Sequence, residues 1–417
     1  MPTGSAKNRF TLDVIRARKG DCLLLHYGTP TKPRLVIIDG GPSGVYQPHL
    51  RPRLQALRAA RKLTATQALP VDVLLVSHVD DDHIKGVLEL TAELREQVGD
   101  REPVFLKVGS LWHNSFDDLL DTTPDQLKVE ASWGAAAVNG KVDIPEGTDP
   151  DVAKVLASIA QGRDLRNDAE LLKWKPNAPF KGLIMAVKGA KPVALGNLTV
   201  RVIGPMRDEL KALQKAHDEF VASQARKKPG AVTAAFVDES IPNLSSIVLL
   251  VECGAKRMLL TGDARGDKIL EGLEVAGVLK KGGSMHVDVL KVPHHGSANN
   301  METVFFERVT ADHYVFSGDG QHGNPERETL EMLFAARGRA PFTLHFTYPI
   351  DEIDVERRKE WEIQKARAKK RGKSRAPWSP STNSLAALIK KTGLAARQSI
   401  VIVSEDAPHL IELLAPL

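Results

Sequence analysis

Residues 77–86 read SHVDDDHIKG, a dense group of ionisable side chains. This stretch packs five ionisable groups into six positions, namely His78, Asp80, Asp81, Asp82 and His83. Three adjacent carboxylates repel one another unless a cation is bound, and histidine with carboxylate is the usual ligand set for zinc or a harder divalent ion. A helix N-cap needs one aspartate, so capping alone does not explain the group. The stretch therefore predicts a metal site.

The flanking segments place this stretch between a strand and a helix. Val71–Val76 is apolar except for Asp72, which predicts a buried strand, and Ile84–Val98 has helical spacing. A turn between two such elements is a favoured place for chemistry. Upstream, the pattern predicts strands at Phe10–Ile15, Cys22–Tyr27 and Arg34–Ile38, and a helix at Arg51–Lys62.

The second half of the chain repeats this alternation of strands and helices. The pattern predicts strands at Leu198–Ile203, Ser246–Glu252, Arg257–Leu260, Val287–Val292 and His313–Phe316, and helices at Met206–Ala225, Asp267–Ala276 and Glu326–Ala336. Polar clusters follow several of these strands, and they contain Asp263, His294, His295 and Asp319. We expect a single domain over residues 1–417, with an insertion at 115–195, a helical insertion at 206–240, a basic segment at 351–378 and a C-terminal extension at 379–417 packed on the core.

The composition is that of an ordinary globular protein, with 42% hydrophobic and 26% charged residues, which excludes a disordered or collagen-like chain. The net charge is +5, but ten Lys/Arg against three Glu give residues 356–375 a charge of +7, so the remainder carries −2. A uniform nucleic-acid-binding coat is thereby excluded. The basic run is either a solvated helix or a docking site for a phosphate backbone or a protein partner.

The cysteine content and the hydropathy pattern predict a cytoplasmic protein. The two cysteines are Cys22 and Cys253, and the second lies in an apolar run typical of a core thiol. The N-terminal residues MPTGSAKNRF contain no apolar stretch of a signal peptide, and no segment has the roughly 18 apolar residues of a membrane span. We expect a soluble chain with no membrane contact.

The order of the motifs resembles the metallo-β-lactamase superfamily, and within it the soluble hydrolase domain of ComEC-like competence proteins. The resemblance rests on KGDCLLL and VIIDGG near the start, on HVDDDH, on LLTGDAR and on LKVPHHGS, and it covers roughly residues 10–110 and 240–340. It implies an α/β fold, an αββα sandwich of two mixed β-sheets flanked by helices. The membrane-embedded part of ComEC proteins has no counterpart here, so DNA uptake is not implied.

The resemblance also implies a site with two divalent cations. One cation would be held by His78, Asp80 and His113, and the other by Asp82, His83 and His294, with Asp263 bridging them and Asp39 orienting a ligand histidine. His294 is preferred as the ligand, with His295 as a neighbour that contacts substrate or donates a proton, although the sequence leaves either order open. His322 is expected to contact a substrate phosphate, to donate a proton, or to cap the following helix.

One position departs from the family pattern. Asp80 stands where the family usually has a second histidine, and a carboxylate there makes the site harder and more negative. Zinc remains the expected ion, and the carboxylate makes manganese a second expected ion.

These residues predict a metal-dependent hydrolase. Its catalytic residues would be Asp82, Asp263, His295 and His322. The expected substrate is a phosphodiester, cleaved by a nuclease or phosphodiesterase reaction with metal-activated water, and the basic segment would hold a nucleic acid. The alternatives are a hydrolase of a small ester, lactone or thioester, and a binding or regulatory module with a degenerate metal site.

Overall fold

The strands of the protein form two mixed β-sheets in the computed structural model, which describes residues 8–114, 150–211, 243 and 245–417. Sheet 1 has seven strands, in the order β15 (His409–Glu412), β1 (Arg9–Val14), β2 (Leu23–Thr29), β3 (Lys32–Ile38), β4 (Leu69–Leu75), β5 (Leu106–Trp112) and β6 (Lys175–Pro176). Sheet 2 has eight, in the order β14 (Gln398–Ile402), β13 (Phe342–Phe346), β12 (Val309–Phe316), β11 (Met285–Lys291), β10 (Lys256–Leu260), β9 (Val248–Cys253), β8 (Leu198–Gly204) and β7 (Val193–Leu195).

Each sheet contains a parallel half whose strand ends carry the polar motifs. In sheet 1 the strands β3, β4, β5 and β6 run parallel, and in sheet 2 the strands from β10 to β14 do so. The carboxyl ends of parallel strands meet at one edge of a sheet. The segments after β3, β4 and β5 therefore lie together, as do those after β10, β11 and β12.

Three clusters of buried apolar side chains separate four layers of structure. One cluster lies between sheet 1 and its helices, a second between the two sheets, and a third between sheet 2 and its helices. Strand β3 shows the cause, because Leu35 and Ile37 face the helices whereas Val36 and Ile38 face the other sheet, as the two-residue period of a strand requires. The αββα sandwich expected from the sequence is confirmed.

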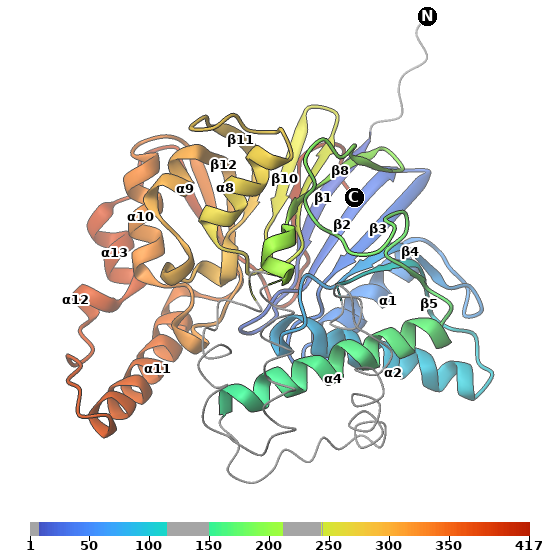
Figure 1. Cartoon of the computed structure of the whole chain (residues 1–417), viewed down its shortest axis with the longest axis horizontal. Helices are drawn as coiled ribbons and strands as arrows, with labels where there is room; N and C mark the ends of the chain where they lie inside the picture. The colour runs from blue at the N-terminus through green and yellow to red at the C-terminus, as the bar shows by residue number, and fades with distance from the viewer. Residues whose placement is uncertain (1–7, 115–149, 212–242, 244) are drawn as a thin grey trace, which may run out of the picture.

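Helices cover the outer face of each sheet (Figure 1). Sheet 1 is covered by α1 (Arg51–Ala60), α2 (Asp81–Gly99) and α4 (Pro150–Leu171). Sheet 2 is covered by α8 (Gly266–Val275), α9 (Thr303–Arg308), α10 (Arg327–Arg337) and α13 (Leu385–Thr392). None of the helices in the described ranges is long and apolar enough to cross a membrane.

Every strand named from the sequence is present, and among the described residues the structure adds six more, β5, β6, β7, β13, β14 and β15. Residues 379–417 contribute α12 (Pro380–Asn383), α13, and one strand to each sheet, β14 to sheet 2 and β15 to sheet 1. Both cysteines are buried and free. Residues 115–149 of the expected insertion, and the expected helix beyond residue 211, lie outside the described residues.

Three histidines form a chain of contacts that links the two sheets. His313 Nδ1 lies 2.9 Å from His345 Nε2, and His345 Nδ1 lies 2.7 Å from His409 Nε2. Burial lowers the pKa of all three rings, and burial together with the charge of His409 and His313 lowers the pKa of His345 to about 3. A neutral chain of imidazoles is therefore part of the folded state.

We predict that acid destabilises the protein partly through His345. Its pKa is lower in the folded state than the ordinary value near 6.5, so the unfolded state binds the extra proton and stability falls as the pH drops below about 6.5. His345→Gln should reduce that pH dependence by about 1.4 kcal/mol per pH unit between roughly pH 6 and 4. Urea unfolding at several pH values measures it, and His286→Gln, at an exposed histidine of β11, is the matched control. Identical slopes for His345→Gln and the wild type would contradict the prediction.

Candidate metal centre

Two glycines bring the first turn of α2 against the end of β3. A Cβ atom on Gly86 would lie 1.9 Å from the carbonyl oxygen of Gly40, so this contact requires glycine. The Gly40 N–H donates to the His83 carbonyl (2.8 Å), and the Gly86 N–H donates to the Gly41 carbonyl (2.9 Å). This close approach places His83 beside Asp39, where Nδ1 and Oδ2 are 2.9 Å apart.

Asp39 and Ser77 together determine which ring nitrogens carry protons. The Ser77 hydroxyl donates to Asp39 Oδ2 (2.8 Å), so its oxygen is left to accept from Nδ1 of His78 (3.1 Å) and of His83 (3.2 Å). The Ser77 backbone N–H donates to the other oxygen of Asp39 (2.7 Å). Both imidazoles are thus protonated on Nδ1, and Nε2 faces the interior. Asp39 thus lies behind the His83 ring, where a carboxylate could orient a ligand histidine, as the sequence predicts.

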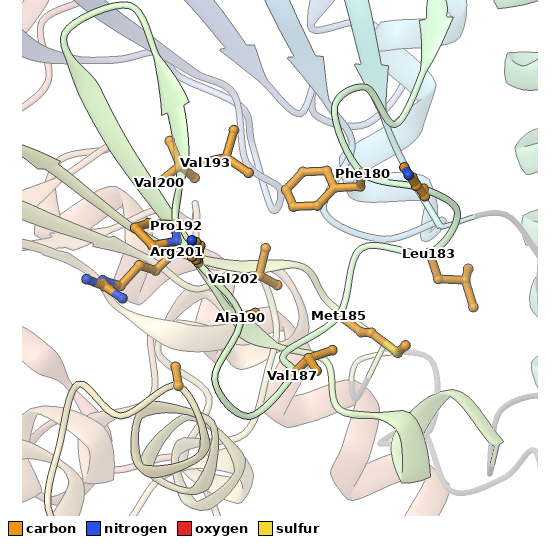
Figure 2. Close-up of a pocket in the computed structure, with 13 residues that line it drawn as sticks. Phe180, Leu183, Met185, Val187, Ala190, Pro192, Val193, Val200, Arg201 and Val202 are labelled. Carbon is orange, nitrogen blue, oxygen red and sulfur yellow. The ribbon is translucent and has the colours of Figure 1, made fainter.

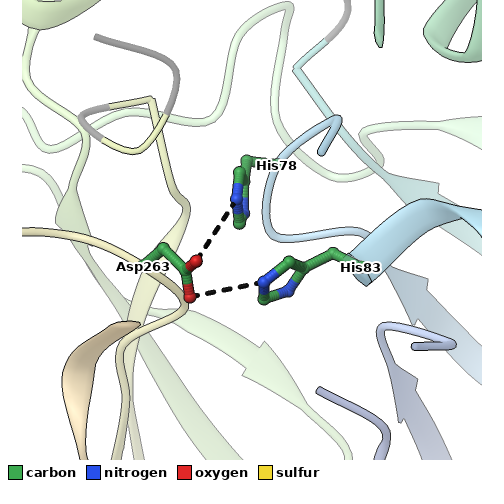
Figure 3. Close-up of side chains that lie close together, drawn as sticks. All are labelled: His78, His83 and Asp263. Atoms are coloured by element: carbon green, nitrogen blue, oxygen red, sulfur yellow. Dashed lines mark ion pairs between the residues drawn. The ribbon is translucent and has the colours of Figure 1, made fainter. Parts of the chain in front are cut away.

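Asp263, which follows β10, faces the imidazoles of His78 and His83 (Figure 3) and also that of His295. Its Oδ2 is 3.7 Å from His78 Nε2, and its Oδ1 is 3.3 Å from His83 Nε2 and 3.4 Å from His295 Nε2. Asp263 Oδ1 and all three Nε2 atoms are buried without a hydrogen-bond partner among the described residues. Buried polar atoms are rarely left unpartnered, so this convergence of lone pairs fits a bound cation.

Protons compensate these groups in the absence of a metal ion. Burial opposes charge on the imidazoles, but Asp263 together with Asp39 holds the pKa of His83 well above its ordinary value. Asp263 and Asp21 likewise outweigh burial at His295 and raise its pKa to about 9. Burial and the neighbouring positive charge of His83 instead lower the pKa of His78 to about 3. A cation entering the site would displace protons from His83 and His295.

The three aspartates of the loop have different surroundings. Asp82 lies 3.9 Å from His83 Nε2 and 4.0 Å from His295 Nε2, facing the cluster. Asp80 lies 3.8 Å from His78 Nε2 with a third of its side chain exposed, and burial with the charge of Asp82 raises its pKa to about 7. Asp81 instead accepts a hydrogen bond from Gln161 (2.7 Å) and pairs with Lys85 (3.1 Å). Asp80 and Asp82 thus face the cluster, whereas Asp81 does not.

The adjacent histidines of η3 (Pro293–Gly296) point in different directions. Both have left-handed backbone angles, with φ of 46° at His294 and 52° at His295, a strained conformation for non-glycine residues. His295 is buried, and its Nε2 lies within 4.8 Å of ligand atoms of both Asp82 and His83. His294 is a quarter exposed, with Nε2 3.7 Å from Asp263 Oδ2. We therefore propose His295 as the ligand and His294 as its neighbour, the reverse of the order preferred from the sequence.

His113 and His322 belong to none of the four groups of potential ligands found among the described residues. His113 is buried at the end of β5, where its backbone is held by Asn177. His322 is exposed in η5 (Gln321–Gly323), and its Nε2 lies 3.0 Å from Lys19 Nζ. An ammonium only donates, so this contact makes Nε2 an acceptor. In this contact Lys19 Nζ is therefore the hydrogen-bond donor, and His322 Nε2 is the acceptor.

Sequence reasoning did not identify Asp21, Lys291 and Ser317, which lie behind His295. Lys291 Nζ is 2.8 Å from Asp21 Oδ2, and the Ser317 hydroxyl donates to Asp21 Oδ1. The signal was Lys291 near the end of the predicted strand Val287–Val292, because a buried lysine needs an acidic partner.

A separate hollow of about 200 Å³ has a different character (Figure 2). Its wall is mainly apolar, formed by Phe180, Leu183, Met185, Val193, Val200 and Val202. The lining contains no histidine, aspartate or glutamate. The candidate chemistry therefore lies in the His/Asp cluster, which we define as His78, Asp82, His83, Asp263 and His295.

The four layers and the buried cluster at the strand ends define a protein of the metallo-β-lactamase fold. Parts of the chain are similar to ComE operon protein 3 of Bacillus subtilis, with 28% identity over 139 residues, 30% of this chain and 17% of that protein. A second similarity is to mouse microtubule-associated protein 1A, with 26% identity over 220 residues, 52% of this chain and 7% of that protein. The chain thus spans less than a fifth of either relative.

Two further comparisons concern models of protein families and solved structures. No model of a known protein family matches the chain. The solved metallo-beta-lactamase fold protein YhfI of Bacillus subtilis aligns over 97% of this chain and 99% of its own, with 12% identity and a TM-score of 0.35.

We predict that His295→Ala weakens zinc binding far more than His294→Ala. Removal of a ligand whose Nε2 faces Asp263 and Asp82 should lower the affinity by about 100-fold or more, whereas the more exposed neighbour should change it by less than about tenfold. Isothermal titration of both variants with Zn²⁺ gives the two dissociation constants. A larger loss in His294→Ala would restore the assignment expected from the sequence.

Proposed function

We propose that the protein is a metal-dependent hydrolase of phosphodiesters. The observation that carries the proposal is the convergence of three buried Nε2 atoms on the carboxylate of Asp263. Protons can balance these groups when no cation is bound, and a hydrolytic metal site would use the same Nε2 atoms as ligands.

The geometry supports two adjacent cation positions that share Asp263. Oδ2 of Asp263 faces His78, with Asp80 alongside, and Oδ1 faces His83 and His295. We propose that Asp82 completes the second position and that His113, as expected from the sequence, completes the first. A donor set of imidazole and carboxylate suits zinc, and the share of carboxylate also admits manganese.

The cations and the nearby side chains would have different roles in the reaction. Divalent cations at such a site lower the pKa of a water molecule and offset negative charge on the substrate. Lys19 would donate hydrogen bonds to a substrate oxygen. Its ammonium points toward His322. Gly20 fixes the backbone after Lys19, because a Cβ there would lie 1.9 Å from the Asp82 carbonyl. A positive charge at the rim of an acidic site favours an anionic substrate such as a phosphodiester.

A basic arm, defined as residues 356–375, begins beside the loop that carries His322. It forms most of α11 (Ile350–Lys370), which leaves the body of the protein below sheet 2 (Figure 1). The buried Arg357 of this arm donates to the carbonyl of Gly323 in η5 (3.0 Å) and thereby joins the arm to the loop of His322. We propose that the arm guides a nucleic acid toward the cluster.

The end of the arm is held in a fixed place and exposes its cations. The guanidinium of Arg375 lies 3.8 Å from the centre of the Trp361 ring, and the Trp361 indole donates to the Ala376 carbonyl (2.9 Å). These contacts fasten the returning segment to the helix. The exposed basic side chains near the tip are Arg367, Lys369, Lys370, Arg371 and Lys373. Such a concentration of positive charge favours a phosphate backbone.

We predict that the zinc- or manganese-loaded protein hydrolyses a bis-aryl phosphate and that Asp263→Ala reduces the rate by at least about 1,000-fold. Loss of the shared carboxylate removes a ligand from both cation positions, while the buried apolar strands keep the fold. Steady-state assays with a bis-aryl phosphate and an uncharged aryl ester measure the preference. Cleavage of the ester alone would support the ester or lactone alternative, and an unchanged rate in Asp263→Ala would refute the site.

We predict that replacing the five exposed basic residues of the tip by glutamine weakens DNA binding and flattens its salt dependence. The slope of log affinity against log salt falls by about 0.9 for each phosphate that the protein no longer neutralises, and turnover of the small diester should persist. Fluorescence anisotropy over a salt series measures both effects. The control replaces the exposed residues Lys62, Arg101, Lys107, Lys280 and Lys281 by glutamine. An equal weakening in the control would mean that net charge, and not the arm, governs binding.

A further inference from the structure

Lys291 and Asp21 form an ion pair that is almost completely buried between the sheets. Each residue is 1% exposed, and Lys291 Nζ lies 2.8 Å from Asp21 Oδ2. The same ammonium donates to the Val292 carbonyl (3.0 Å). A buried ion pair contributes little net stability because both ions lose their hydration, so its presence beside the candidate centre calls for another reason.

The other oxygen of Asp21 faces the imidazole of His295. Asp21 Oδ1 is 3.4 Å from His295 Nδ1, and it also accepts the hydroxyl proton of Ser317. Ser317 has thereby used its single proton, so its oxygen accepts from His295 Nδ1 at 3.0 Å. Both neighbours of Nδ1 are acceptors. The ring proton is therefore fixed on Nδ1, and Nε2 is left to face Asp263 and Asp82.

We propose that Asp21, clamped by Lys291, is a positioning residue that fixes the ring orientation and tautomer of His295 for metal binding. This inference rests on the proposed metal site. Outer partners of ligand histidines hold the ring in its binding orientation, and their loss typically costs 10- to 100-fold in metal affinity.

The origin of the three groups explains why the pair is ionic. Lys291 ends β11, the strand that leads directly into η3 and His295, whereas Asp21 comes from the β1–β2 connection of sheet 1. The ammonium accordingly ties a carboxylate of one sheet to the strand that carries the ligand in the other. Asp39 plays the equivalent part for His83 with the Ser77 backbone N–H as its donor, and it needs no contact across the sheets.

The test compares single and double replacements of the pair. Asp21→Asn or Lys291→Met alone leaves one buried charge unpaired and should destabilise the fold. The double variant Asp21→Asn/Lys291→Met removes both charges at similar volume, and its urea midpoint should return close to that of the wild type. Its zinc affinity, measured by isothermal titration, should remain lowered by 10- to 100-fold. Restored stability with wild-type zinc affinity would overturn the proposal and reduce the pair to a structural role.

A matched ion pair on the same strand provides the control. Lys256 Nζ lies 2.5 Å from Asp288 Oδ1, and Asp288 precedes Lys291 by three positions on β11. The double variant Lys256→Met/Asp288→Asn should bind zinc as the wild type does. An equal loss of affinity in this control would attribute the effect to the strand and overturn the proposal.

A measurement on the unaltered protein covers the case in which the double variant does not fold. Long-range ¹H–¹⁵N NMR of the zinc-loaded protein should show the ring proton of His295 on Nδ1, protected from exchange, with His295→Gln used for the assignment. A proton on Nε2 would overturn the proposal. Failure of the wild type to bind zinc at all would instead refute the proposed function, so the two failures are distinguishable.

Discussion

The structure depends on one electrostatic constraint, namely that several carboxylates and imidazoles are buried within a few ångströms of one another. Asp263 is held in its ionised form, with a pKa well below its usual value, because His295, His83 and His294 outweigh the effect of burial. Such a cluster is stable only if protons or metal ions balance its charge. The parallel strand ends, the close glycine contacts and the serine hydroxyls can all be understood as means of holding these groups in place despite their mutual repulsion.

The two halves of the protein hold their ligands in corresponding ways. In sheet 1, Asp39 and Ser77 fix the ring of His83, and across the interface Asp21 and Ser317 fix the ring of His295. Each pair combines a carboxylate with a hydroxyl behind an imidazole. The cluster therefore requires both sheets in register, which accounts for its position at their shared edge.

Much of the fold was predictable from the sequence, because buried strands with short apolar runs and amphipathic helices leave clear periodic signals. Strands β13 and β15 were missed because His345 and His409 interrupt their apolar pattern, although burial lowers the pKa of both rings in the folded protein. The cluster was predicted from its residue types. The different orientations of the His294 and His295 rings could not be predicted, because they depend on two successive residues in the left-handed region. Asp21 was missed because its partners lie some 270 positions or more along the chain.

The pairing of β1 with β15 has a consequence for the synthesis of the protein. Residues 11–14 take residues 409–412 as their partners, so β1 is synthesised well before the strand that covers its edge. Until then β1 is an open sheet edge, a surface that invites pairing with other chains. Contacts so distant in sequence also form slowly. Sheet 1 therefore gains its edge strand only after the residues between β1 and β15 have been synthesised.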